Sequence, residues 1–361
     1  MNSRPLLITG ATGFIGRYVT AELLRRGHAL RAIVRPGRDA SALPWLNHPH
    51  LGQVTADLTQ ADGLADAVAG TDAVIHLAAA KTGDWATQTA QTLTATKNLL
   101  QAMAYTGVRR LVQISSFSVY DYQRLPENSL LTEASPLEAA PHHRDIYAQM
   151  KLAQEEQVRQ FAAAQNGRVT ILRPGIVYGR GQWWTAGLGA NLRNWLWLRI
   201  GRQAPLPLTY VENCAIAIAQ AIERPAAIGQ TLNLVDDPAP TQDTYVRLLA
   251  ERGLRPHGTI PISWGWMRQA ADLMESLDDH LHQRLGRRLK RPGLLTPASL
   301  HARVKPLRYS SDRARQVLQW SPRYSLPEAL DRCQSSLALP VLSPEVPLPR
   351  GKQMGTARPI V

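Results

Sequence analysis

The chain has 361 residues, of which 44% are hydrophobic, so it can bury one large core or two unequal ones. Its formal net charge is +13, but most of the basic residues are Arg scattered along the chain, and we expect no nucleic-acid partner. Two cysteines, Cys214 and Cys333, offer neither a disulfide framework nor metal-ligand spacing. Because no secretory leader or membrane-spanning apolar run is visible, we expect a cytoplasmic protein without a metal.

The first predicted elements surround a glycine-rich turn, "ITGATGFIG", at residues 8–16. A short apolar run at 6–9 precedes it, and apolar side chains recur at helical spacing from 14 to Gly27. A strand, a glycine turn and a helix in this order predict a dinucleotide site, where a pyrophosphate meets the helix N-terminus. The G-x-x-G-x-x-G spacing alone also fits a plain strand–helix turn.

Strand and helix patterns alternate over the following segments. The predicted strands lie at residues 30–35, 73–80, 110–116 and 169–175. Helical patterns lie between them, including those at 92–107 and 145–165. Repeated βα units predict an α/β fold with a Rossmann-type, doubly wound parallel sheet.

The amino-acid composition changes after Gly175 and suggests a division into domains. We expect residues 1–175 to form the nucleotide-binding domain, with 207–237 returning to it. Residues 176–206 are rich in Gly and Trp, and residues 238–335 are Pro-spaced and rich in helical patterns. These two segments are predicted to form a smaller, mostly helical substrate region. Residues 340–361 are rich in Pro and lack periodicity, which predicts a disordered tail.

The most informative chemical pattern is Tyr147-x-x-x-Lys151. On a helix, residues four apart project from one face, so the phenol and the ammonium would lie together. The predicted strand just before this helix ends in Ser115 and Ser116, at the carboxyl edge of the sheet, where ligands of such folds bind.

In this order and at these distances, the motifs resemble those of the extended short-chain dehydrogenase/reductases, the epimerase/dehydratase superfamily. The motifs are "TGATGFIG", "HLAAA", "ISSFSVY", "YAQMK" and "LRPGIVYG". The resemblance covers residues 5–335 and includes a late segment at 309–332, where Gln319 replaces a usual Gly. The pattern is most similar to the 3β-hydroxysteroid-dehydrogenase and dihydroflavonol-reductase-like branch.

The resemblance implies a role for each catalytic candidate. Tyr147 would be the general acid/base, and Lys151 would hold the nicotinamide ribose and, with the oxidised nicotinamide, lower the pKa of Tyr147. Ser116 would bind the substrate oxygen, with its neighbour Ser115 as the alternative. Asn98 matches a family Asn that supports the active-site helix, although a solvated helix Asn is an alternative.

The resemblance also implies a set of cofactor contacts. Asp57 would contact adenine, unless it only caps a nearby helix, and Tyr147 and Lys151 would meet the nicotinamide end. The remaining contacts are Gly10, Thr12, Gly13, Phe14, Ile15, Gly16, Leu58, Leu77, Ala78, Ala79, Pro174 and Val177.

The end of the second predicted strand bears on the choice between NADP and NAD. An NAD site normally places a carboxylate there for the ribose 2′-OH, but this chain has Val34 followed by Arg35. Arg35, with Arg38 as a second candidate, could bind a 2′-phosphate. The sequence therefore favours NADP, and NAD stays possible.

The substrate is less well defined. The Asp-Glu pair of the family's dehydratases is replaced by Phe117 and Ser118, and "GIVYG" stands where nucleotide-sugar epimerases usually have Asn. Six tryptophans would suit a broad apolar substrate, although they could instead fill the smaller core or meet a partner subunit. They are Trp183, Trp184, Trp195, Trp197, Trp264 and Trp266.

These observations favour an NAD(P)-dependent oxidoreductase that interconverts a secondary alcohol and a ketone or aldehyde on an apolar or lipid-like small molecule. A nucleotide-sugar epimerase or reductase is the alternative. A non-catalytic, cofactor-binding regulatory protein is a further one, against which the intact Ser116, Tyr147 and Lys151 argue. The basic cluster at 282–293 suggests peripheral contact with an anionic membrane, or a solvated helix face. The sequence leaves open whether the protein forms a homodimer.

Overall fold

A seven-stranded parallel sheet forms the centre of the protein in the computed structural model, which describes residues 4–38, 43, 45–192, 196–254, 258–285 and 293–334. Its strand order is β12-β7-β5-β4-β1-β2-β3. The strands are β1 (Leu6–Thr9), β2 (Leu30–Val34), β3 (Leu51–Thr55), β4 (Ala73–His76), β5 (Arg110–Ile114), β7 (Arg168–Pro174) and β12 (Thr231–Leu234). Five of the predicted strand positions thus appear as neighbouring strands of one sheet.

The order of the strands makes the sheet doubly wound. From β1 the chain moves outward to β2 and β3, and then returns to add β4, β5 and β7 on the other side. Every neighbouring pair in this sheet is parallel. The predicted Rossmann-type fold is confirmed. The order in which strands are added to the sheet reverses between β1 and β4, and this switch point opens a ligand crevice at the carboxyl ends of the two strands.

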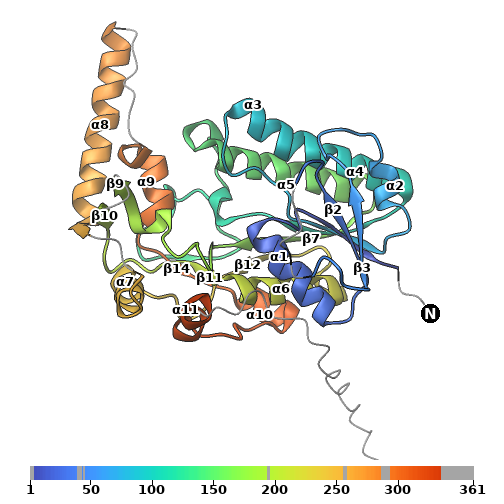
Figure 1. Ribbon diagram of the computed structural model, residues 1–361. Helices are drawn as coiled ribbons and strands as arrows, with labels where there is room; N and C mark the ends of the chain where they lie inside the picture. Colours follow the sequence, from blue (N-terminus) through green and yellow to red (C-terminus); the bar gives the residue numbers. More distant parts are fainter. Residues whose placement is uncertain are drawn as a thin grey trace, which may run out of the picture.

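Helices cover both faces of the sheet (Figure 1). One layer holds α2 (Leu64–Val68), α4 (Ala95–Thr106) and α5 (Ile146–Ala164), preceded by α3 (Trp85–Gln88) and a π-helical turn at Thr89–Thr94. The other holds α1 (Phe14–Arg25), α6 (Val211–Glu223) and α10 (Asp312–Leu318). Because both faces are covered, strands such as β1 and β5 are buried along their whole length and consist largely of apolar residues.

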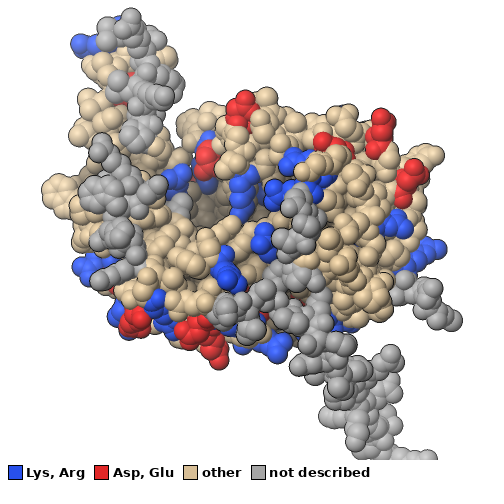
Figure 2. Space-filling view, viewed as in Figure 1, with Lys and Arg blue, Asp and Glu red and all other residues tan. Residues whose placement is uncertain are grey.

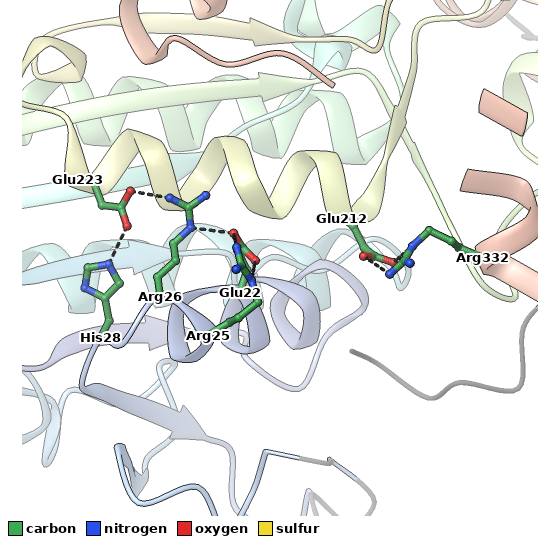
Figure 3. A network of polar contacts seen from close by, with 7 residues as sticks. All are labelled: Glu22, Arg25, Arg26, His28, Glu212, Glu223 and Arg332. Atoms are coloured by element: carbon green, nitrogen blue, oxygen red, sulfur yellow. Dashed lines mark hydrogen bonds and ion pairs between the residues drawn. The ribbon is translucent and has the colours of Figure 1, made fainter. Parts of the chain in front are cut away.

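Polar contacts add to the apolar packing between α1 and α6 (Figure 3). Arg26 lies between two carboxylates, 2.7 Å from Glu22 and 2.7 Å from Glu223, and His28 lies 2.9 Å from Glu223. At the other end of α6, Glu212 pairs with Arg332 of α11 (Leu326–Gln334). Since most of these groups are partly exposed, each pair contributes no more than about 1 kcal/mol.

The smaller region contains a sheet that the sequence analysis did not predict. Strands β9 (Gly189–Leu192), β10 (Leu196–Ile200) and β13 (Gly258–Ile262) pair in the order β13-β10-β9. β10 and β13 are parallel although they lie far apart in the chain, so no local turn signal joins them. The helices are α7 (Gln242–Glu251), α8 (Trp264–Leu285) and α9 (Pro297–Val304). Figure 1 shows α8 extending away from the rest of the molecule.

Two short strand pairs connect the parts of the chain. β8 (Ile176–Tyr178), which follows β7, pairs with β11 (Leu208–Tyr210), and β6 (Leu130–Leu131) pairs with β14 (Arg308–Tyr309). These pairs bring the segments after β5 and β7 next to the C-terminal part of the chain. Within the described ranges, no helix is long and apolar enough to cross a membrane.

Candidate active site

The glycine turn after β1 forms a tight cradle at the start of α1. Gly10 has φ +71°, and a Cβ there would lie 2.9 Å from the backbone nitrogen of Ala78. A Cβ at Gly16 would overlap the carbonyl oxygen of Gly10. Gly13 begins α1 without a side-chain cap, so the first N–H groups of the helix, including those of Phe14 and Ile15, stay available to an anion.

A cavity of about 310 Å³ lies beside this cradle. It brings together most of the predicted cofactor contacts: Gly10, Thr12, Gly13, Arg35, Asp57, Leu58, Leu77, Ala78 and Ala79. Phe14, Ile15 and Gly16 form the adjacent first turn of α1, and Pro174 lies buried at the end of β7. We call this space the cofactor cavity.

The two arginines after β2 lie on the rim of the cofactor cavity. Arg35 and Arg38 both line it and both are exposed. Neither guanidinium forms an ion pair with any other residue that the structure describes. Asp57 lines the same cavity, where one carboxylate oxygen accepts hydrogen bonds from the backbone nitrogen and the hydroxyl of Thr59, each at 2.9 Å.

Asn98 lies next to the cofactor cavity and does not line the space that holds Ser116 and Tyr147, while Lys151 is buried and lines neither cavity. Its amide nitrogen on α4 donates to the carbonyl oxygen of Leu58 at 3.0 Å. Asn98 therefore ties the loop after β3 to α4, two elements that border this cavity.

A larger cavity of about 910 Å³ holds Ser116 and Tyr147, and we call it the substrate cavity. Ser116 lines it, whereas Ser115 is only 3% exposed and does not. The Ser116 hydroxyl caps a short 3-10 helix (Phe117–Val119), accepting from the Ser118 nitrogen at 3.1 Å, and it acts to lower the pKa of Tyr147. Val177, the remaining predicted cofactor contact, lines this cavity as well.

Helix α5 carries Tyr147 and Lys151 side by side. Asp145 caps the helix by accepting from the Ala148 nitrogen at 2.9 Å, which fixes the first turn, where Tyr147 lies. The ammonium of Lys151 lies 6.0 Å from the centre of the Tyr147 ring. It donates to the carbonyl oxygen of Ile114 at 2.8 Å and to Oε1 of Gln154 at 2.9 Å.

The surroundings of this pair shift both pKa values before any cofactor contributes its charge, so the lowering that the resemblance implies for Tyr147 with the oxidised nicotinamide stays a prediction. Burial raises the pKa of Tyr147 to about 12, although the hydrogen bond from Ser116 opposes the shift. Burial also lowers the pKa of Lys151 to about 7, and the nearby ammonium of Lys81 adds to the effect. The residues of the chain alone therefore leave Tyr147 protonated at neutral pH, which suits the donation of a proton.

A buried chain of hydrogen bonds runs from Lys151 to the glycine turn. The Gln154 amide nitrogen donates to the Thr96 hydroxyl at 2.8 Å, and that hydroxyl lies 2.9 Å from Nε2 of His76. Nδ1 of His76 lies 2.7 Å from the hydroxyl of Thr9, the residue before Gly10. Because the Thr96 hydroxyl donates to the Thr92 carbonyl at 2.6 Å, it must accept from both Gln154 and His76.

The donor and the acceptor of each hydrogen bond in this series are consequently fixed. His76 is neutral, since burial lowers its pKa to about 3, so it carries its proton on Nε2 and accepts from Thr9. The Gln154 amide can then face only one way, with its oxygen toward Lys151. Sequence analysis did not single out Gln154 or His76, although His76 lies in the quoted "HLAAA" motif.

A buried ion pair fixes the same helix to the sheet. Glu155, four residues after Lys151, accepts from Arg173 of β7 at 2.8 and 2.6 Å. Both residues are 2% exposed, and Arg173 also donates to the Tyr120 hydroxyl at 3.1 Å. The pair was missed, although the continuing four-residue spacing after Tyr147 and Lys151 was a signal for Glu155.

The walls of the substrate cavity come from both parts of the chain. Apolar and aromatic side chains line it, and of the six tryptophans only Trp184 does so among the described residues; Trp195 lies outside them. Trp184 donates to the Leu254 carbonyl oxygen at 2.7 Å and packs against Trp197. Figure 2 shows a hollow in this face with Lys and Arg side chains on its walls. Lys81 and Arg303, which sequence analysis had not singled out, line the cavity.

Comparison with known proteins agrees with this geometry. The model of the family described as "NAD dependent epimerase/dehydratase family" matches residues 6–234, from β1 to β12. The chain belongs to this family. It is therefore an NAD(P)-dependent oxidoreductase of the extended short-chain dehydrogenase/reductase type, as the motifs indicated.

Two relatives match over nearly the whole chain. The 2-alkyl-3-oxoalkanoate reductase of Stenotrophomonas maltophilia is 28% identical and covers 92% of this chain and 99% of its own. The 3β-hydroxysteroid dehydrogenase/Δ5→4-isomerase of Mycobacterium tuberculosis is 28% identical, over 91% of this chain and 89% of its own. Among solved structures, the UDP-glucuronic acid 4-epimerase of Bacillus cereus, in complex with NAD, has a TM-score of 0.67 at 18% identity, over 91% of this chain and 98% of its own. That likeness shows the fold alone.

Proposed function

We propose that the protein is an NADP-dependent reductase that interconverts a ketone and a secondary alcohol on an apolar, lipid-like substrate. The observation that carries this proposal is the substrate cavity. Its volume of about 910 Å³ is large enough for a lipid-sized molecule, and the hydroxyls of Ser116 and Tyr147 share it with Phe117, Ile146 and Trp184.

The geometry suits the reduction of a carbonyl group. Tyr147 would donate its proton to the carbonyl oxygen, while the Ser116 hydroxyl would hold that oxygen by a hydrogen bond. Lys151 uses two of its three N–H donors on Ile114 and Gln154 and can offer the third to a ribose hydroxyl. The nicotinamide, when bound, supplies the hydride.

The names of the long relatives support a lipid-like substrate. One is a reductase of 2-alkyl-3-oxoalkanoates and another a dehydrogenase of 3β-hydroxysteroids, and both match over about nine-tenths of the chain. These names combine a ketone or secondary alcohol with a bulky apolar body, which fits the walls of the substrate cavity.

The rim of the cofactor cavity supports the preference for NADP. Arg35 and Arg38 follow β2 without a carboxylate that would repel a phosphate, and both guanidiniums are exposed and lack an ion-pair partner among the described residues.

The two buried free cysteines, Cys214 and Cys333, suit a reducing compartment such as the cytoplasm.

The proposal is tested by following NADPH consumption with a long-chain 3-oxo ester, a 3-oxosteroid and a UDP-sugar in parallel. We expect NADPH oxidation with the lipid ketones, formation of the matching secondary alcohol and free exchange of the cofactor. A cofactor that stays bound through purification, together with inversion of the UDP-sugar and no net NADPH consumption, would identify an epimerase instead.

A further inference from the structure

The charges that line the substrate cavity do not cancel. Its ionisable side chains, apart from tyrosines, are Lys81, Arg144, Asp145 and Arg303. Arg144 is neutralised by Glu138 at 3.1 Å, and its guanidinium also donates to the carbonyl oxygens of Tyr120 and Ser118. Asp145 is occupied as the N-cap of α5, where the helix end balances its charge.

Lys81 and Arg303 are left without a counter-charge. Neither has an ion pair or a side-chain hydrogen bond with another residue in the described part of the chain. Lys81 lies in the loop after β4 and Arg303 on α9, so the two cations reach the cavity from its two sides, the nucleotide-binding sheet and the C-terminal region.

The position of Lys81 places its charge close to the reacting groups. Its ammonium helps to lower the pKa of Lys151, and desolvation lowers the pKa of Lys81 itself. Two ammonium groups that repel each other are both stabilised when an anion binds between or beside them. The cavity is therefore arranged to attract a negative charge near the catalytic hydroxyls.

We propose that Lys81 and Arg303 form a subsite for an anionic group on the substrate, so that the substrate is an apolar acid and not a neutral lipid. The inference rests on the proposed reductase function. A guanidinium binds a carboxylate or a phosphate oxygen pair equally well by its two-pronged geometry. A carboxylate is the better match here, because the same cavity is also lined by apolar and aromatic side chains, including Phe117, Trp184 and Tyr309, which would take a hydrocarbon chain.

The first experiment compares a long-chain 3-oxo acid with its methyl ester, which lacks the negative charge and is larger by one methyl group. For the wild-type enzyme with NADPH, we expect kcat/KM to be at least about 10-fold higher for the acid. In Arg303→Gln this preference should disappear through a rise in KM for the acid, while kcat/KM for the ester changes much less. The matched control is Arg313→Gln, because Arg313 is exposed on α10 and does not line the cavity.

The second experiment measures binding without turnover. Calorimetric titration of dodecanoate into the enzyme saturated with NADP⁺ should give an affinity that falls about 10-fold or more in Arg303→Gln and in Lys81→Gln, with dodecanol as the neutral probe unaffected. Tighter binding of dodecyl phosphate than of dodecanoate would assign the subsite to a phosphate.

The outcomes separate this inference from the proposed function. Equal kcat/KM for acid and ester would overturn the anionic subsite and leave the reductase intact, whereas no turnover of either would overturn the reductase. If Lys81→Gln weakens NADPH binding and leaves dodecanoate binding unchanged, Lys81 serves the cofactor and the two-cation site is wrong.

Discussion

At the scale of single residues, the state of Tyr147 decides what the site can do. Its pKa of about 12 means that the phenol keeps its proton at neutral pH, so the chain by itself presents a proton donor. Substitution by Phe removes only the hydroxyl and keeps the ring that packs at the start of α5.

We expect Tyr147→Phe to lower kcat by about 10² to 10⁴-fold, because the proton donor is lost, while the Kd for NADPH changes little. Turnover is measured by NADPH oxidation, and binding by fluorescence titration. Tyr105→Phe is the control, since Tyr105 is 85% exposed and lies away from both cavities. Turnover close to that of the wild type in Tyr147→Phe would contradict the assignment.

Arg35 is the residue on which cofactor choice depends. We expect NADPH to bind more tightly than NADH, and Arg35→Ala to weaken NADPH by about one to two orders of magnitude, since a charged hydrogen bond contributes about 1.5 to 3 kcal/mol. NADH, which lacks the 2′-phosphate, is the internal control and should bind the variant as well as the wild type. An equal loss for both cofactors would show that Arg35 does not recognise the phosphate.

At the scale of elements, α5 is fixed by two different kinds of buried contact. The Glu155–Arg173 pair ties the helix to β7, and Gln154 ties Lys151 to α4, β4 and the glycine turn through Thr96 and His76. Gln154 is neutral, so it orients the Lys151 ammonium while raising its pKa less than a carboxylate would. The low pKa of Lys151 should therefore depend on residue 154.

We expect Gln154→Glu to raise the pKa of Lys151 by about one unit or more, because a carboxylate stabilises the adjacent ammonium. A free-enzyme ionisation near pH 7 in the profile of kcat/KM should move to higher pH in this variant. In Gln154→Leu it should move to lower pH, since the buried ammonium loses an acceptor. Gln160→Leu, on the same helix, should keep the wild-type profile, because among the described residues the Gln160 side chain hydrogen-bonds only Glu156, at the surface. An unshifted profile in both position-154 variants would show that Gln154 only fills space.

At the scale of the whole molecule, α8 stands apart from the rest of the protein. Trp266, Leu273 and Leu277 are 74%, 62% and 46% exposed on this helix. The basic cluster at 282–293, for which the sequence left open membrane contact or a solvated helix face, starts at its end, and residues 286–292 lie outside the described part of the chain. Exposed apolar side chains next to a basic sequence, in a chain with a net charge of +13, are typical of a surface that meets anionic headgroups.

We propose that this end of the molecule binds anionic membranes. The protein should sediment with vesicles that contain phosphatidylserine at low salt and leave them as ionic strength rises, because salt screens the attraction. Leu273→Ser combined with Leu277→Ser should reduce the bound fraction, and vesicles of phosphatidylcholine alone should bind little. If the protein does not bind the anionic vesicles at low salt, the proposal that this end of the molecule binds membranes is wrong.

Short-range spacing in the sequence was enough to predict several features of the protein. The glycine turn, the alternation of strands and helices, and the common face of Tyr147 and Lys151 all follow from the periods of a strand and a helix, which need no distant partner. The strand ends also predicted which residues gather at the carboxyl edge of the sheet, and nine of the proposed cofactor contacts line one cavity.

Only the tertiary structure decided which residues meet across long distances in the chain. It separated Ser116 from its buried neighbour Ser115, paired β10 with β13, and placed Lys81 and Arg303 on one cavity. It also showed that the residues of the chain alone raise the pKa of Tyr147, because desolvation of the phenol depends on everything packed around it. The lowering expected from Lys151 together with the oxidised nicotinamide stays a prediction. Spacing along the chain fixes which side chains share a face, but burial and charge depend on the folded surroundings as a whole.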